Sequence, residues 1–330
     1  MKKIRVVSVG LGPIGLAAAR LVLSKNSIEL VGAVDPDPDK AGRDLGDLLG
    51  GPSLGISVCG KLSELYEKKP DAVLHCTSSF LPQVEQQILE AVDAGINVVS
   101  STEELLAPWF RHPNIAEELD RRALAGNATI LGTGVNPGYA MDFLAVVASA
   151  VCFDLSAVRC TRVVDAGTRR LPLQQKVGAG LSPDEFRTRQ EAGGFGHIGM
   201  EESVALVGRA LGLSLDRVEQ SLEPVIADQE HKTPFLTVAS GRVAGIRNLG
   251  RGWRRGELVV ELDLTMAVGS KEPRDVIEIV GDPPIKLRVD GGIPGDQATA
   301  AILVNSLMGV VQAAPGLKTV LDLPSPRLVR

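Results

Sequence analysis

The chain has 330 residues, of which 44% are hydrophobic and 23% charged, and its formal net charge is −5. This composition is typical of a globular protein, and the length exceeds what one hydrophobic core usually serves, so two domains are expected. The acidic balance, without a cluster of Lys and Arg among aromatic residues, argues against nucleic acid or an anionic membrane as partner. A small molecule is the expected partner.

No apolar stretch approaches the ~18 residues of a membrane span, and the first residues run into a strand pattern rather than a signal peptide. The four cysteines are scattered without CxxC spacing; they are Cys59, Cys76, Cys152 and Cys160. Neither a disulfide nor a metal site is therefore expected, and a cytoplasmic location fits.

The first 140 residues alternate short β-branched runs with amphipathic stretches, which is typical of βαβ units. Strands are expected at Ile4–Val9, Ile28–Val34, Ala72–Cys76, Asn97–Ser101 and Ala128–Leu131. Helices are expected at Ile14–Ser24, Leu81–Ala94 and Ile115–Ala125. We therefore expect an α/β fold that begins with a Rossmann parallel-sheet domain over residues 1–140.

Residues 141–330 show a different pattern, in which strand-like segments follow one another without a helix between each pair. These segments are Ala157–Val164, Arg217–Ala227, Gly256–Met266, Val276–Val280 and Ile285–Val289. Helices are expected at Ala140–Ala150, Met200–Leu211 and Gln297–Ala313. The pattern predicts an α+β domain with a mostly antiparallel sheet, whose C-terminal segment could pack back on the Rossmann domain. Gly167–Gly199 is weakly periodic and is expected to be a mobile loop or lid.

A glycine-rich motif, Gly10-Leu11-Gly12-Pro13-Ile14-Gly15, directly follows the first strand and opens the first helix. In that context GxGxxG predicts a dinucleotide site. Gly10 permits the tight turn, Gly12 lets the backbone approach the pyrophosphate, and Gly15 lets the helix pack close to the sheet.

Asp35 ends the second strand, twenty residues beyond Gly15, where a ribose-binding acid is expected. A carboxylate there accepts hydrogen bonds from the adenosine ribose hydroxyls and repels a 2′-phosphate. Asp37 and Asp39 add negative charge, and no arginine follows immediately. The sequence therefore favours NAD as cofactor, with NADP as the second choice.

Two polar segments are expected at the carboxyl edge of the sheet, where ligands bind. Thr77, Ser78 and Ser79 would either border the nicotinamide ribose or form an ordinary loop. Glu103 and Glu104 would either lie near the nicotinamide or serve as first-turn helix carboxylates, with Thr102 as N-cap. Residue type alone leaves both alternatives open.

Other polar residues are candidates for the substrate pocket. The turn that contains Thr133 and Asn136 is rich in Gly and Pro; Asn136 would bind the nicotinamide carboxamide or the substrate, or the segment is a structural turn alone. His197 lies between Gly196 and Gly199 and would line the pocket, whereas His75 is expected to be a core residue and His112 receives no role. A substrate carboxylate would need a cation such as Arg162, Arg169, Arg170 or Lys176, and solvated surface charge is the alternative.

Further motifs recur along the chain in the order found in a known family. They are Asn97-Val98-Val99-Ser100-Ser101-Thr102-Glu103-Glu104-Leu105, Leu131-Gly132-Thr133-Gly134-Val135-Asn136-Pro137-Gly138, Gly196-His197-Ile198-Gly199, Leu222-Glu223-Pro224 and Ile293-Pro294-Gly295. With the glycine motif, they make the whole chain resemble the 2,4-diaminopentanoate dehydrogenase and native amine dehydrogenase family. The N-terminal domain of that family is similar to that of dihydrodipicolinate reductase.

The resemblance implies reversible NAD(P)-dependent oxidative deamination of an amine to a ketone or aldehyde, with release of ammonia. It also implies a homodimer built through the second domain, and a glutamate of the pair as acid/base. Homoserine dehydrogenase has a lysine after the corresponding strand, and aligning the two sequences places that lysine at Glu103. The alignment therefore favours Glu103 over Glu104 as the acid/base. That sister activity is disfavoured because Glu103 replaces the lysine, and dihydrodipicolinate reduction because no His-His pair occurs.

Two alternatives remain beside an amine dehydrogenase. One is a 2,4-diaminopentanoate dehydrogenase acting on a diamino acid, and the other is a non-catalytic NAD-binding regulator. Glu103 and Glu104 argue against the regulator, because a carboxylate is the group that this chemistry requires.

Overall fold

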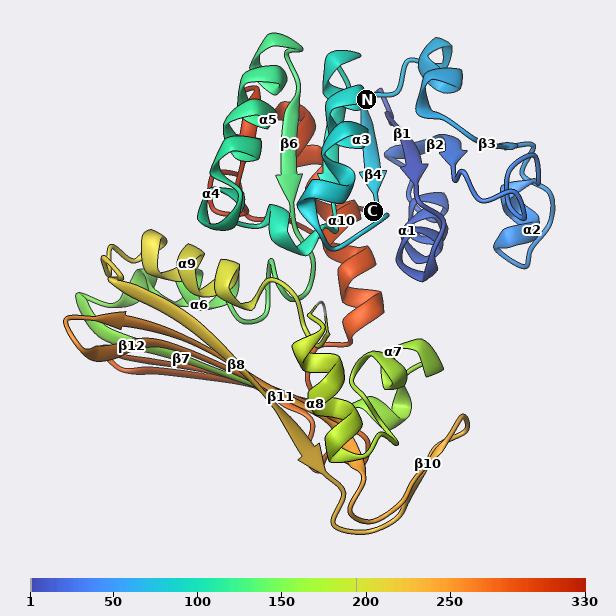
Figure 1. Cartoon of the computed structure of the whole chain (residues 1–330). Helices are drawn as coiled ribbons and strands as arrows, with labels where there is room; N and C mark the ends of the chain where they lie inside the picture. The colour runs from blue at the N-terminus through green and yellow to red at the C-terminus, as the bar shows by residue number, and fades with distance from the viewer. Residues whose placement is uncertain (1, 194) are drawn as a thin grey trace. The chain divides into compact units, whose positions relative to one another are not determined.

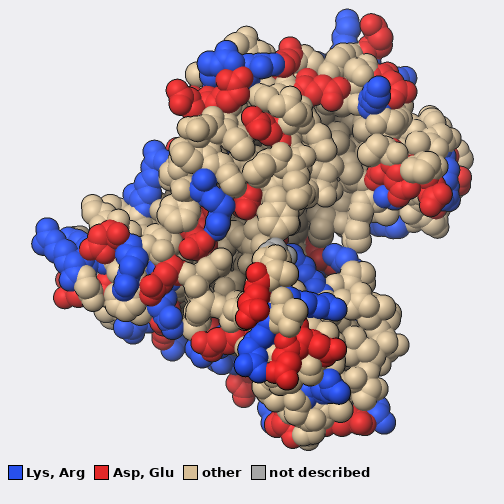
Figure 2. Space-filling view, viewed as in Figure 1, with Lys and Arg blue, Asp and Glu red and all other residues tan. Residues whose placement is uncertain are grey.

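The computed structural model describes residues 2–193 and 195–330. The chain divides into two compact units, one formed by Met1–Tyr139 with Pro294–Arg330 and the other by Ala140–Ile293. Among the described residues, no helix combines the length and apolarity that a membrane span requires. Figure 2 shows Lys and Arg interspersed with Asp and Glu over the face in view, so charges of both signs mix there.

The first unit contains a seven-stranded sheet in the order β15-β6-β5-β4-β1-β2-β3, and all of its neighbouring strands pair in parallel. The strands are β1 (Ile4–Val9), β2 (Ile28–Val34), β3 (Val58–Cys59), β4 (Ala72–His75), β5 (Asn97–Ser100), β6 (Thr129–Gly132) and β15 (Gly316–Lys318). The strand order reverses between β1 and β4. In open α/β sheets, ligands bind outside the carboxyl ends of the strands at such a reversal.

Helices cover both faces of this sheet (Figure 1). Helix α1 (Pro13–Leu23) packs against α10 (Gly295–Gln312), and α3 (Leu81–Asp93) packs against α5 (Pro113–Ala125). The shorter elements are α2 (Leu45–Leu48), α4 (Pro108–Arg111) and the 3-10 helices η1 (Leu62–Lys68) and η2 (Glu103–Leu105).

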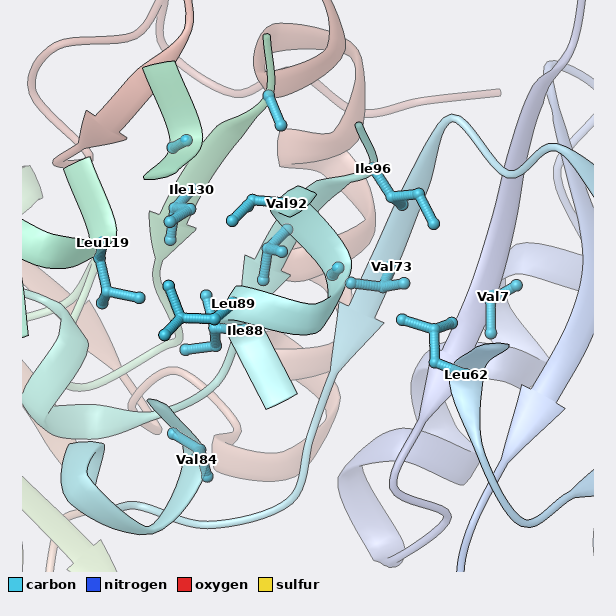
Figure 3. Close-up of a cluster of buried hydrophobic side chains, with 14 of the residues drawn as sticks. Val7, Leu62, Val73, Val84, Ile88, Leu89, Val92, Ile96, Leu119 and Ile130 are labelled. Atoms are coloured by element: carbon cyan, nitrogen blue, oxygen red, sulfur yellow. The ribbon is translucent and has the colours of Figure 1, made fainter. Parts of the chain in front are cut away.

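One core of the first unit lies between the strands and the pair α3 and α5 (Figure 3). The cluster includes Val7 and Ile130 from strands, Val84 and Ile88 from α3 and Leu119 from α5, and all five are buried. Removing such a side chain from water contributes about 1.5–3 kcal/mol. Every residue of β4 and β6 is buried, as expected for parallel strands with both faces covered.

The second unit contains a six-stranded sheet in the order β14-β13-β7-β12-β11-β8. Strands β7 and β12 pair in parallel, and the other neighbours pair antiparallel. The strands are β7 (Asp154–Asp165), β8 (Arg217–Ile226), β11 (Val243–Arg254), β12 (Glu257–Ala267), β13 (Arg274–Asp282) and β14 (Ile285–Asp290), with a separate pair β9 (His231–Lys232) and β10 (Thr237–Val238). The fold class predicted from the sequence, a Rossmann domain and a mostly antiparallel α+β domain, is confirmed.

The helices of the second unit are α6 (Phe143–Ala148), α7 (Leu171–Lys176), α8 (Pro183–Glu191) and α9 (Met200–Ala210), with the 3-10 helices η3 (Ser149–Val151) and η4 (Ala166–Thr168). Helix α9 lies on β8, β11 and β12. The interpretation of Gly167–Gly199 as a loop was wrong over α7 and α8; Gly194 lies outside the described residues. Helix α8 begins with a capping box of Ser182 and Glu185, and its Phe186 is buried.

The C-terminal segment 294–330 also differs from its predicted assignment to a domain of residues 141–330. It belongs to the first unit, because α10 packs on α1 and β15 extends the parallel sheet beside β6. The sequence had indicated this return only as an option. The Rossmann unit is therefore built from both ends of the chain.

Candidate active site

The glycine turn between β1 and α1 has the geometry that its sequence predicts. Gly10 has φ +83°, and a Cβ there would lie 2.5 Å from the carbonyl oxygen of Cys76. A Cβ on Gly15 would lie 1.8 Å from the carbonyl oxygen of Gly10. A Cβ on Gly12 would meet no atom within 4 Å, and Gly12 is the N-cap of α1. The turn thus borders open space at a helix N-terminus, which suits a pyrophosphate.

A cavity of about 440 Å³ in the first unit begins at this turn. Gly10, Gly12, Asp35 and Thr77 of the predicted cofactor residues line it, together with Lys40. Its lining does not include Leu11, Pro13, Ile14, Gly15, Ser78, Ser79 or Asn136. The cavity, the turn and the open space at Gly12 together fit a dinucleotide.

Asp35 at the end of β2 is 6% exposed, and its carboxylate has three donors. The Leu11 amide (2.8 Å) and Lys40 Nζ (2.9 Å) donate to Oδ2, and the Asp37 amide (3.1 Å) donates to Oδ1. Burial raises the pKa of Asp35, but hydrogen bonds from Lys40, Leu11 and Asp37 outweigh it and hold the pKa below its ordinary value. Asp35 is therefore ionised at neutral pH.

His75 at the end of β4 is the centre of a buried polar network, which agrees with its prediction as a core residue. Its Nδ1 lies 2.8 Å from Ser100 Oγ, and its Nε2 lies 2.9 Å from Gln87 Oε1. Burial lowers the pKa of His75 to about 4. The Ser100 hydroxyl donates to Thr102 Oγ1 (2.9 Å), whose own hydroxyl donates to the carbonyl of Ser78 (2.9 Å). This chain of hydrogen bonds ties the loop after β4 to the loop after β5.

Glu104 strengthens the same connection between the two loops. Its amide donates to the Ser79 carbonyl (3.2 Å), and its Oε2 accepts from the Leu81 amide (2.8 Å) at the start of α3. His112 Nε2 lies 2.9 Å from the same oxygen, and Arg111 Nε lies 3.9 Å from Oε1. The Glu104 side chain is 8% exposed. Its carboxylate is thus committed to the scaffold.

Glu103 occupies a different position, although it is the adjacent residue. It begins η2, directly beyond β5, and it is half-buried. Strand β6 approaches η2 closely, since a Cβ on Gly132 would lie 2.5 Å from the carbonyl oxygen of Leu105. Thr102 is the N-cap residue of η2, as predicted, but its hydroxyl donates to the Ser78 carbonyl and makes no cap hydrogen bond.

The segment from Thr133 to Gly138 forms a compact turn. The Thr133 amide donates to the Ser100 carbonyl (2.9 Å), and the Val135 amide donates to Thr299 Oγ1 (3.3 Å). Gly138 has φ +123°, and a Cβ there would lie 2.4 Å from the amide nitrogen of Gly134. Thr133 Oγ1 is buried, with no hydrogen-bond partner among the described residues. The structural-turn interpretation thus has direct support, and ligand roles for Thr133 and Asn136 stay predictions.

Two candidates for the substrate pocket belong to the second unit. His197 is half-buried; desolvation, Lys176 and Arg162 lower its pKa to about 3, so its imidazole is neutral at pH 7. Arg162 is 3% exposed, and its Nη1 and Nη2 donate to Asp275 Oδ1 and to the Ile293 carbonyl, each at 2.6 Å. Arg162 is therefore not the solvated surface charge that was the alternative, and binding of a substrate carboxylate by Arg162 stays a prediction.

Sequence reasoning missed two residues that contact predicted ones, Lys40 and His112. Lys40 contacts Asp35 because consecutive turns reverse the chain: the Asp37 amide bonds the Asp35 side chain, and the Asp39 amide bonds the Asp37 side chain. The alternation of Asp and Pro over residues 35–39 is the signal that could have indicated these turns. Within the described ranges, no group of His, Cys, Asp or Glu has the arrangement of a metal site.

Residues 139–330 match the family model described as the 2,4-diaminopentanoate dehydrogenase C-terminal domain. The chain is 32% identical over 338 residues to 2,4-diaminopentanoate dehydrogenase of Acetoanaerobium sticklandii, with 100% of this chain and 96% of that protein covered. It is 26% identical over 354 residues to an amine dehydrogenase of Streptomyces virginiae, with 97% and 96% covered.

The solved structure of amine dehydrogenase from Mycobacterium smegmatis has the same architecture. Its TM-score is 0.86 at 26% identity, with 98% of this chain and 97% of that chain covered. These similarities confirm the predicted resemblance and the predicted enzyme class, an NAD(P)-dependent oxidoreductase acting on amines. The chain therefore belongs to the 2,4-diaminopentanoate dehydrogenase family.

Proposed function

We propose that this protein is an amine dehydrogenase that interconverts an amine with a ketone or aldehyde and ammonia, with Glu103 as its acid/base. The names of its relatives support the reaction. The observation that carries the assignment of the residue is the difference between the two glutamates. Glu104 is bound to Leu81 and His112 within the scaffold, and the alignment with homoserine dehydrogenase, which has its lysine at the position of Glu103, favours Glu103 for the chemistry.

The reaction explains why a carboxylate suits this position. An amine is mostly ammonium at neutral pH, and hydride departs only after the nitrogen lone pair is free. The Glu103 carboxylate would attract the ammonium and accept its proton, which frees the nitrogen lone pair for the departure of hydride. Water would then add to the iminium carbon, and ammonia would leave to give the carbonyl product. The bound nicotinamide cofactor supplies the hydride acceptor. In the reverse direction Glu103 returns the proton to the amine.

The cofactor proposal rests on the glycine turn and Asp35. Gly10 and Gly12 would hold the pyrophosphate at the N-terminus of α1, and Asp35 would accept the adenosine ribose hydroxyls. We expect NADH to be preferred over NADPH. Replacing Asp35 by Ala should narrow that preference, and a strong preference of the unmodified protein for NADPH would contradict the role of Asp35.

The substrate is either a simple amine or a diamino acid, and two residues bear on the choice. A neutral His197 imidazole would accept a hydrogen bond from an ammonium without repelling it, which supports a role for His197 in substrate binding. A diamino acid would need a cation for its carboxylate. Because Arg162 pairs with Asp275, the candidates for that role are Arg169, Arg170 and Lys176. An amine without a carboxylate needs no such cation, and it is the substrate class that we favour.

The test is a screen of ketones and aldehydes with NADH and excess ammonium, in which NADH oxidation is followed by absorbance. Ammonium is omitted in the control, and 2,4-diaminopentanoate is assayed in the oxidative direction. Ammonium-dependent turnover supports the proposal, and turnover of the diamino acid alone would favour the second substrate class. NADH binding without turnover of any amine would instead indicate a non-catalytic regulator.

We also propose a homodimer formed through the second unit and a cytoplasmic location. All four cysteines are free thiols, which suits a reducing compartment. Light scattering during size-exclusion chromatography measures the mass directly. A monomer at micromolar concentration would contradict the dimer.

A further inference from the structure

Lys40 carries an ammonium group in the nucleotide cavity that the expected motif does not include. Its Nζ lies 2.9 Å from Asp35 Oδ2 and 3.3 Å from Asp37 Oδ2. The side chain is 29% exposed and lines the cavity with Asp35 and Gly12. Lys61, beyond β3, lines the same cavity. Two cations thus border a cavity in which sequence reasoning found only acidic residues.

The backbone fixes where the Lys40 ammonium lies. Asp35 and Asp37 each accept a hydrogen bond from the amide two residues on, at 3.1 and 3.0 Å. The amide of Lys40 then donates to the Asp37 carbonyl (2.9 Å), so the chain reverses and returns Lys40 toward β2. These local bonds position the lysine before any ligand binds.

The position matters because Asp35 occupies the place of the acid that bonds the adenosine 2′-hydroxyl. A group in contact with that acid is within reach of whatever the 2′-oxygen carries. A lone carboxylate there repels a 2′-phosphate. A lysine ammonium on the same carboxylate offsets the repulsion and offers a charge-assisted hydrogen bond to a phosphate oxygen.

We propose that Lys40 is a specificity-determining residue that allows the protein to bind NADP(H) as well as NAD(H). With NAD(H), Lys40 stays on Asp35 and Asp37 while Asp35 takes the ribose hydroxyls. With NADP(H), its flexible side chain places the ammonium between the 2′-phosphate and the two carboxylates. The inference rests on the cofactor part of the proposed function and on no part of the amine chemistry.

The test measures binding rather than turnover. Titration calorimetry of the full chain with adenosine 2′,5′-bisphosphate and with ADP isolates the 2′-phosphate, and NADPH and NADH are then compared by fluorescence. Lys40→Gln removes the charge and keeps most of the side chain. We expect it to weaken the bisphosphate and NADPH about tenfold or more, because a charge-assisted hydrogen bond is lost and two carboxylates face the phosphate unshielded. ADP and NADH should change less than about threefold.

Three further variants make the result specific to Lys40. Lys40→Arg should retain NADPH binding, because guanidinium also pairs with phosphate. Lys61 lines the same cavity without a contact to Asp35 in the described structure. Lys61→Gln should therefore weaken the binding of NADPH less than Lys40→Gln does. Lys3→Gln, an exposed lysine outside the cavity lining, should change neither nucleotide. Thermal unfolding of each variant confirms that it is folded.

Several outcomes would overturn the inference. Equal losses for both nucleotides in Lys40→Gln would make the lysine a structural partner of Asp35 only. Equal losses in Lys61→Gln and Lys40→Gln would assign the effect to the general charge of the cavity. If the unmodified protein bound neither nucleotide, the cofactor assignment would fall with it. Failure to oxidise amines while both nucleotides bind would overturn the amine chemistry alone.

Discussion

Glu103 and Glu104 are adjacent in sequence, and the proposed function gives them different roles. Glu104 accepts from the Leu81 amide and from His112, and these bonds hold the start of α3 against η2. Glu103 begins η2 at the carboxyl edge of the sheet. Replacement of each carboxylate by an amide of the same shape should therefore affect different measured quantities.

Glu103→Gln should reduce ammonium-dependent NADH oxidation by about 10²–10⁴-fold, because it removes the group that exchanges the proton with the nitrogen and the charge that attracts the ammonium. NADH binding should survive, because the glycine turn and Asp35 are unchanged. Glu104→Gln should lower the free energy of unfolding by about 1–3 kcal/mol, as expected when a buried charged hydrogen-bond acceptor is weakened, and should cost less than about tenfold in rate. Steady-state kinetics and urea unfolding measure the two effects. The opposite pattern would move the acid/base role to Glu104, and near-normal turnover in both variants would remove the carboxylate mechanism.

His75 predicts how stability depends on pH. Its pKa is about 4 in the folded protein, and an unfolded histidine titrates near 6.5. As pH falls from 6.5 toward 4, the unfolded chain binds a proton that the folded protein does not, so stability is lost in that window and His75 contributes no further change below it. The loss from this residue is roughly 3 kcal/mol. Urea unfolding of the unmodified protein and of His75→Gln, at pH 7 and pH 4.5, should show the smaller pH dependence in the variant. Identical pH dependence would assign the titration to other groups.

For single residues, the sequence predicted where a functional residue lies along the chain better than it predicted which side chains that residue contacts. The spacing from Gly15 identified Asp35, because the length of one strand–turn–helix–strand unit is nearly constant. The contact with Lys40 was missed, since it depends on two turns that place an ammonium against a strand end. His112 was assigned nothing because its bond to Glu104 crosses from α4 to η2, and no local pattern indicates such a bond.

At the scale of elements, the turn that joins β1 to α1 contains one glycine that is expected to matter for cofactor binding and another that is expected to matter for stability. Gly12→Ala should leave the unfolding free energy nearly unchanged, since the new Cβ meets open space, but it should weaken NADH binding at least about tenfold by occupying the approach of the pyrophosphate. Gly15→Ala should instead destabilise the fold by about 1–3 kcal/mol or more, since its Cβ would collide with the Gly10 carbonyl. Calorimetric titration and urea unfolding of both variants give the comparison. Unchanged NADH affinity in a folded Gly12→Ala protein would place the pyrophosphate elsewhere.

The packing of each strand explains whether its sequence pattern allowed it to be predicted. The strands β1, β2, β4, β5 and β6 were predicted because buried parallel strands are continuous apolar runs. Strand β11 was missed because its face toward α9 carries Asn248, Gly250 and Gly252 rather than large apolar residues. A Cβ on Gly250 would lie 2.7 Å from Met200 Cγ, so the helix fills the space that a strand side chain would take. Glycines that let a helix pack close to a strand remove the apolar residues by which the strand would be predicted from the sequence.

For the whole molecule, the sequence predicted the boundary near residue 140, whereas it indicated the return of the C-terminal segment to the Rossmann unit only as an option. The change from alternating βα units to consecutive strands marks where the second unit begins. Nothing in the apolar pattern of α10 says which sheet it covers, because a helix buried on several sides suits either unit. Its partners are α1 and the strands β4, β5 and β6.

This arrangement predicts which parts of the chain fold alone. Residues 1–139 lack α10 and β15, so the part of the sheet that α10 covers, at β4, β5 and β6, and the edge at β6 would be exposed to water. We expect that segment to aggregate or to remain partly unfolded. A chain that joins residue 139 to residue 294 through a short Gly/Ser linker should fold and bind NADH, because the amide of Val135 already bonds Thr299 and brings the two ends close together. Circular dichroism melting and NADH titration of the two chains decide the matter. A cooperative melt and NADH binding by residues 1–139 alone would show that the C-terminal segment is an accessory to the Rossmann unit, whereas failure of the joined chain would show that residues 140–293 are needed to fold it.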